Sequence, residues 1–68
     1  MYRVGVDLGG TNIVSAVIDE NYNIISKSRV KTNAPRPAED IFDDIAKTIK
    51  DAIAAANLTM NDILSIGI

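Results

Sequence analysis

One apolar stripe, repeating every four residues, constrains this chain more than any other feature of its sequence; its members are Ile41, Ile45, Ile49 and Ile53. A repeat of this length predicts the apolar face of a single α-helix. We expect Phe42, Ala46 and Ala52 to widen that face. Pro37 suits the first position of the helix, and Asn57 suits its end. A helix with one apolar face packs against another layer, so the rest of the chain has to supply a sheet.

The first half of the chain has the periodicity of strands. Residues 2–8 alternate between apolar and other side chains, which predicts a β-strand. Residues 13–18 form a nearly continuous β-branched run, which is typical of a strand covered on both faces. Residues 24–32 form a third strand. The connections between these three segments are short, so we expect an antiparallel meander.

The end of the chain predicts a fourth strand over residues 63–68. Residues 33–37 are expected to form a loop before the helix, and Thr59 with Asp62 predicts a short capped turn after it. A strand–helix–strand crossover of this length implies parallel pairing within one sheet. Both faces of this last strand are apolar apart from Ser65 and Gly67, so we expect cover on both sides. One helix covers only one face, and the sequence therefore predicts the β-β-β-α-β opening of a larger α/β domain.

The composition excludes several kinds of chemistry. The 68 residues include no Cys and no His, which excludes a disulfide framework, a Ser/His/Asp triad and a common zinc site. The net charge of −2 and the scarcity of aromatic residues argue against nucleic-acid binding. No apolar run is long enough to span a membrane, and no targeting segment is visible. We therefore expect a cytoplasmic protein with neither nucleic acid nor membrane as a partner.

The segment with specific chemical content is the turn between the first two strands, Asp7-Leu8-Gly9-Gly10-Thr11-Asn12. Two consecutive glycines permit positive φ angles and let a ligand approach the backbone closely. Successive N–H groups in such a turn form a concave site for anions, to which the Thr11 hydroxyl and the Asn12 amide add donors. Asp7, at the end of a strand, is an acceptor beside that site. A carboxylate next to phosphates suits Mg²⁺, often through water.

Plainer interpretations stay open on these residues alone. Gly-Gly is an ordinary hairpin turn, and a tight hairpin without a ligand explains the segment equally well. One face of the third strand carries a row of basic side chains, and such a row is more typical of a solvated edge strand than of an anion site; its members are Lys27, Arg29 and Lys31.

The stretch from Val4 to Ile13, continued by Ala16-Val17-Ile18-Asp19, resembles the phosphate-1 motif of the ROK family. This family contains bacterial glucokinases, fructokinases and N-acetylhexosamine kinases, together with related transcriptional repressors. The resemblance extends in layout over the whole chain. It implies a ribonuclease-H-like, actin-like ATPase fold, with residues 1–68 as the N-terminal part of one incomplete lobe and a mixed sheet covered by one helix.

The resemblance also implies a function. Gly9, Gly10, Thr11 and Asn12 would contact the phosphates of ATP, and Asp7 would lie near Mg²⁺, through water. The parent protein would be an ATP-dependent hexose kinase of carbohydrate metabolism and glycolysis, most simply a glucokinase, and we expect it to form a homo-oligomer.

The general base of such a kinase would lie beyond Ile68, as would its sugar-binding residues and any zinc site. The 68 residues alone are accordingly expected to have no catalytic residue and no kinase activity. The alternatives are a ROK-type sugar-sensing repressor, disfavoured because Met1 directly precedes the first strand, and a non-catalytic interaction module.

Overall fold

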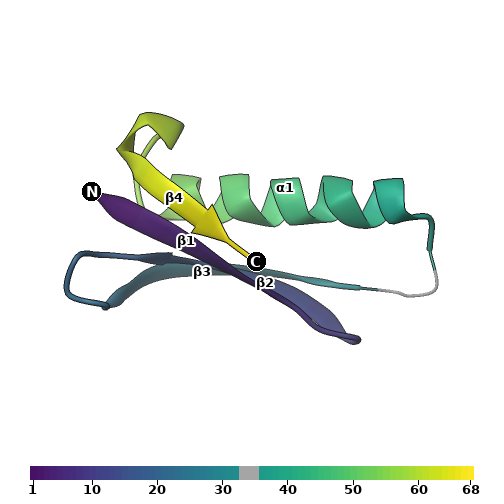
Figure 1. Ribbon diagram of the computed structural model, residues 1–68. Coiled ribbons are helices and arrows are strands. Elements are labelled where there is room, and N and C mark those ends of the chain that lie inside the picture. Colours follow the sequence, from purple (N-terminus) through teal and green to yellow (C-terminus); the bar gives the residue numbers. More distant parts are fainter. Residues whose placement is uncertain (33–35) are drawn as a thin grey trace.

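The computed structural model describes residues 1–32 and 36–68, which form one mixed sheet and one long helix (Figure 1). The elements follow the order expected from the sequence: β1 (Tyr2–Leu8), β2 (Asn12–Ile18), β3 (Ile24–Lys31), α1 (Ala38–Ala55), the short 3₁₀ turn η1 (Met60–Asp62) and β4 (Ile63–Gly67). The loop predicted over residues 33–37 falls partly outside the described residues, which exclude 33–35.

The four strands lie in the order β3-β2-β1-β4. β1 pairs antiparallel with β2, and β2 pairs antiparallel with β3, which confirms the predicted meander. β4 returns after α1 and pairs parallel with β1, as the crossover argument requires. The basic strand β3 is therefore one edge of the sheet, and the apolar strand β4 is the other.

Helix α1 begins one residue later than predicted and ends where predicted. Pro37 is the N-cap rather than the first helical residue, because its ψ of 142° is extended while its carbonyl already accepts the N–H of Asp40. At the other end, Asn57 adopts a φ of 59°. The N–H of Asn57 donates to Ala54 O at 3.0 Å and that of Leu58 to Ile53 O at 3.1 Å, which together form a Schellman motif.

One face of the sheet packs against α1, mainly through β2 and β3. The apolar core comes from both layers: Val4, Val6, Ile13, Val17, Ile45, Ile49, Ala52 and Ile53. The predicted widening of the helical face was wrong for Phe42, which is 65% exposed, and for Ala46, which is also exposed. At about 100° per residue Phe42 points between Ile49 and Ile53, so its exposure comes from its place near the start of α1, where the buried residues begin only at Ile45. Thr48, three residues after Ile45, lies on the covered face and is fully buried.

The face of the sheet opposite α1 is open, and so is most of β4. On β2 the buried residues Ile13, Ser15 and Val17 alternate with half-buried ones, so only one face of this strand is covered. The prediction that both of its faces are covered was wrong. On β4, Leu64 is 57% exposed and Ile66 42% exposed. α1 packs against β2 and β3 and leaves β4 without the expected cover.

The turn between β2 and β3 is organised by one carboxylate. Asp19 accepts hydrogen bonds from the backbone N–H of Asn23 at 2.9 Å, from the Asn23 side-chain amide at 3.1 Å and from the backbone N–H of Asn21 at 2.8 Å. These bonds, that from the Asn23 backbone above all, hold the pKa of Asp19 below its ordinary value. The turn Thr59–Asp62 is capped as predicted, because the Asp62 carboxylate accepts the N–H of Thr59 at 2.8 Å.

Candidate functional site

The candidate site is the tight turn that joins β1 to β2. The strands close at the pair Leu8 and Ile13, and the N–H of Gly9 donates to Asn12 O at 3.0 Å. The two glycines permit positive φ angles, but neither of them adopts one in the described structure. Gly9 is required by close packing, because a Cβ at this position would lie 3.2 Å from Asn12 O. A Cβ on Gly10 would enter open space.

The turn exposes backbone donors. Within residues 1–32 and 36–68, the N–H groups of Gly10 and Thr11 have no protein acceptor, and both residues are exposed. Adjacent N–H groups that are free in this way form a natural binding site for an anion such as phosphate. The exposed hydroxyl of Thr11 belongs to the same turn.

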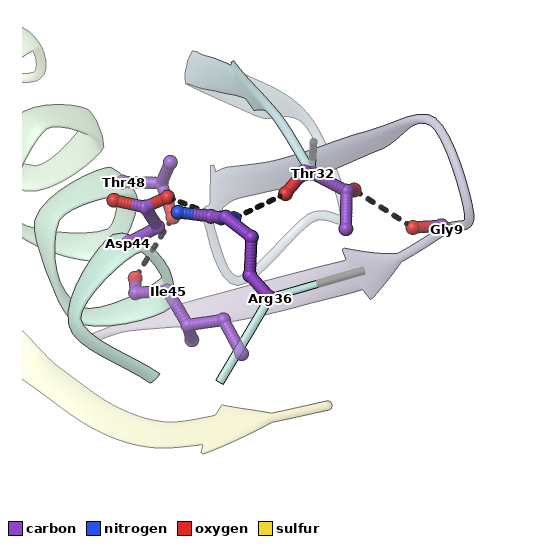
Figure 2. Close-up of polar contacts among 6 residues, drawn as sticks. All are labelled: Gly9, Thr32, Arg36, Asp44, Ile45 and Thr48. Atoms are coloured by element: carbon purple, nitrogen blue, oxygen red, sulfur yellow. Dashed lines mark hydrogen bonds and ion pairs between the residues drawn. The ribbon is translucent and has the colours of Figure 1, made fainter. Parts of the chain in front are cut away.

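A buried threonine supports the turn from its inner side. Thr32, which directly follows β3 and is 4% exposed, donates its N–H to Thr11 O at 2.9 Å and its hydroxyl to Gly9 O at 2.9 Å. Figure 2 shows its side chain directed at Gly9. The sequence alone gives no sign of a role for Thr32, because a Thr at the end of a strand has no distinctive spacing. Only the pairing of β3 with β2 brings it to the turn.

Thr32 is in turn connected to the helix. Its carbonyl accepts a hydrogen bond from Arg36 Nε at 2.8 Å, and Arg36 Nη2 lies 2.7 Å from Asp44 Oδ2 on α1 (Figure 2). The ion pair is mostly shielded, with side chains 23% and 30% exposed. A continuous chain of polar contacts therefore runs from Asp44 to Gly9.

The side chains of Asp7 and Asn12 lie on the open face of the sheet. Asp7 pairs with Val14 and Asn12 with Lys31, and strand alternation sets these residues opposite the face that α1 covers. The structure thus brings Asp7 and Asn12 to one side of the turn, together with the basic end of β3. Lys27, Arg29 and Lys31 are exposed on the edge strand, as predicted.

The residues around the turn could hold Mg²⁺ only together with a bound phosphate and water. Among the described residues no three His, Cys, Asp or Glu side chains lie close enough together to hold a metal ion by themselves. Mg²⁺ in nucleotide sites is commonly held by one or two carboxylates, the substrate phosphates and water. Asp7, one strand residue before the Leu8–Ile13 pair that closes the turn, is compatible with that arrangement.

Known proteins resemble this chain in both sequence and structure. The profile of the ROK family matches residues 3–68. Glucokinases of Streptomyces coelicolor and Streptomyces lividans are each 45% identical over 49 residues, covering 72% of this chain and 15% of those proteins. A glycerol kinase of Rhizobium meliloti is 31% identical over 75 aligned residues, covering 98% of this chain and 15% of that protein.

Solved structures agree. A ROK family glucokinase from Streptomyces griseus, in complex with glucose and AMPPNP, superposes with a TM-score of 0.74 at 31% identity, covering 98% of this chain and 20% of that one. The component A of (R)-2-hydroxyglutaryl-CoA dehydratase from Acidaminococcus fermentans shares the fold, with a TM-score of 0.69, 21% identity and coverage of 100% of this chain and 25% of that one.

These matches define first a class and then a family. The mixed four-stranded sheet with one covering helix is the α/β arrangement of an actin-like ATPase fold, as found in the N-terminal part of the Streptomyces griseus glucokinase. The chain belongs to the ROK family. It spans no more than a quarter of the length of the relatives named above. No helix in the described residues is long and apolar enough to cross a membrane.

Proposed function

We propose that residues 1–68 supply the phosphate-binding segment of an ATP-dependent sugar kinase that transfers the γ-phosphoryl group of ATP to a hexose, with glucose as the first candidate. The observation that carries this proposal is the Gly9–Asn12 turn, in which Gly10 and Thr11 are exposed and their N–H groups have no acceptor among residues 1–32 and 36–68. Membership of the ROK family supports it. So does the match to a glucokinase that was crystallised with glucose and AMPPNP.

Each residue of the turn has a role under this proposal. Gly10 and Thr11 donate N–H groups to phosphate oxygens, and Thr11 and Asn12 add side-chain donors. Gly9 provides the close packing against Asn12 O that a side chain would disturb. Asp7 would hold Mg²⁺ through water, and the metal ion would neutralise charge on the phosphates.

A segment without a general base can still contribute to phosphoryl transfer. Phosphoryl transfer depends mostly on positioning and on stabilisation of charge, and a rigid array of N–H donors supplies both. We assign no catalytic residue to these 68 residues. The general base and the sugar-binding groups are contributed by other parts of the parent enzyme, which we propose to be a cytoplasmic homo-oligomer.

The test is a titration of the ¹⁵N-labelled chain with Mg²⁺·AMPPNP, comparing wild type, Gly10→Val and Gly67→Val by NMR. Gly67 is a matched control, because a Cβ there also enters open space but lies on β4, away from the turn. We expect wild type and Gly67→Val to bind with shifts centred on residues 9–12, and Gly10→Val to bind at least tenfold more weakly, by about 1.4 kcal/mol or more. Equal binding by all three proteins would exclude the phosphate role.

A second experiment tests the kinase assignment. Residues 1–68 would replace the matching segment of the Streptomyces griseus glucokinase, and the chimera would be assayed for glucose-dependent ATP turnover. The same chimera with Gly10→Val is the control. We expect turnover in the first chimera and a severe loss in the second. A folded chimera whose activity is unaffected by Gly10→Val would contradict the proposal and favour a non-catalytic role for the segment.

A further inference from the structure

Thr32 occupies the two carbonyl groups that border the centre of the turn. Its hydroxyl donates to Gly9 O and its N–H to Thr11 O, each at 2.9 Å. In a trans peptide the C=O and the following N–H point in opposite directions. Because the Gly9 carbonyl points toward Thr32, the N–H of Gly10 points away from Thr32. In the same way, the Thr11 carbonyl points toward Thr32 and the N–H of Asn12 points away from it.

Thr32 is itself held in place from the helix layer. Arg36 Nε donates to the Thr32 carbonyl at 2.8 Å, and the Arg36 guanidinium pairs with Asp44 of α1 at 2.7 Å (Figure 2). α1 is fixed on the sheet by a buried hydroxyl pair, Ser15 Oγ to Thr48 Oγ1, at 2.9 Å. The orientation of the turn is therefore coupled to the packing of the helix through contacts that are buried or mostly shielded.

We infer that Thr32 is a positioning residue that orients the Gly10 N–H donor of the Gly9–Asn12 turn before the nucleotide binds, and that the Arg36–Asp44 pair holds Thr32 to α1. This inference rests on the proposed function. A bare hairpin of Gly-Gly-Thr has many accessible peptide orientations, and a ligand would have to order them on binding. Thr32 lowers that cost, because it fixes the Gly9–Gly10 and Thr11–Asn12 peptide planes in the free protein.

The test compares Thr32→Val, which keeps the N–H but removes the hydroxyl, with the conservative Thr32→Ser. Ser26→Ala is the matched control, because Ser26 is also on the β3 segment and also donates its hydroxyl to a carbonyl, that of Ala52, far from the turn. Affinity for Mg²⁺·AMPPNP, hydrogen exchange of the Gly10 amide and urea stability would be measured for each. Loss of one orienting hydrogen bond predicts about a tenfold weaker affinity for Thr32→Val, affinity near that of wild type for Thr32→Ser, and no change for Ser26→Ala.

The outcomes separate the two proposals. If wild type does not bind Mg²⁺·AMPPNP, the proposed function fails and this inference fails with it. If wild type binds and Thr32→Val binds equally well, the phosphate role stands and the positioning role is refuted. A loss of affinity in Ser26→Ala as large as that in Thr32→Val would reduce Thr32 to a stabilising contact and also refute the inference.

Arg36→Met provides a second route if Thr32→Val is unfolded. It removes both the hydrogen bond to the Thr32 carbonyl and the ion pair with Asp44, while the Thr32 hydroxyl and N–H are kept. We expect an affinity loss of about threefold together with faster exchange of the Gly10 amide. Unchanged affinity and unchanged exchange in a folded Arg36→Met protein would refute the role of the ion pair.

Discussion

The buried hydroxyl pair between Ser15 and Thr48 allows a quantitative test of how α1 is held on the sheet. Both residues are 0% exposed, and their oxygens lie 2.9 Å apart. Thr48 Oγ1 also donates to Ile45 O at 2.8 Å, as Figure 2 shows. A hydroxyl has one proton to give, so Ser15 must be the donor to Thr48. Removing the Ser15 hydroxyl and removing the Thr48 hydroxyl should therefore lower the free energy of unfolding by different amounts.

Thr48→Val is the more damaging single change. It conserves shape and helix propensity, but it leaves the Ser15 hydroxyl buried without a partner, which costs about 1–3 kcal/mol. Ser15→Ala removes one hydrogen bond and leaves Thr48 still bonded to Ile45 O, which costs about 0.5–1.5 kcal/mol. In the double variant both hydroxyls are gone and nothing polar is stranded, so its stability should equal that of Ser15→Ala. The coupling energy then equals in size the whole cost of Thr48→Val, about 1–3 kcal/mol.

The assay is urea unfolding followed by far-UV circular dichroism, with a constant m-value required for all variants. The pair Ser26→Ala and Thr48→Val is the control cycle, because these residues make no hydrogen bond to each other and their effects should add. Additivity of Ser15→Ala and Thr48→Val to within about 0.3 kcal/mol would refute the reasoning. So would a Ser15→Ala variant less stable than Thr48→Val.

Two further predictions concern the turns. Asn57 has a φ of 59°, so Asn57→Ala should destabilise the chain by about 1 kcal/mol while Asn57→Gly should be neutral or stabilising, as measured by urea unfolding; equal stability of the two variants would contradict this. The pKa of Asp19 is lowered in the folded state, chiefly by the Asn23 N–H, so its ionised form stabilises the fold above the ordinary pKa of 3.8, and this contribution disappears as the pH falls through the lower folded-state pKa. The stability advantage of wild type over Asp19→Asn should therefore be present at pH 7 and shrink only below pH 3.8, and an advantage that is constant down to full protonation would refute this.

Periodicity in the sequence was sufficient to predict the order and the type of the elements. The strand alternation of residues 2–8 and the four-residue stripe of α1 are local patterns, and each specifies its element without reference to the rest of the chain. The turn signals at Asn57 and at Thr59–Asp62 were confirmed for the same reason, since a left-handed residue and a capping box act within a few positions.

The sequence by itself therefore determined the β-β-β-α-β order and the position of the Asp7–Asn12 turn. Only the tertiary structure decided which part of α1 is buried, because its packing against β2 and β3 leaves Phe42 exposed near the start of the helix and brings Thr48 onto Ser15. It also decided what supports the turn. Thr32 and Arg36 have no pattern of their own, and they reach Gly9 and Asp44 because the pairing of β3 with β2 and the packing of α1 bring together residues that are distant along the chain.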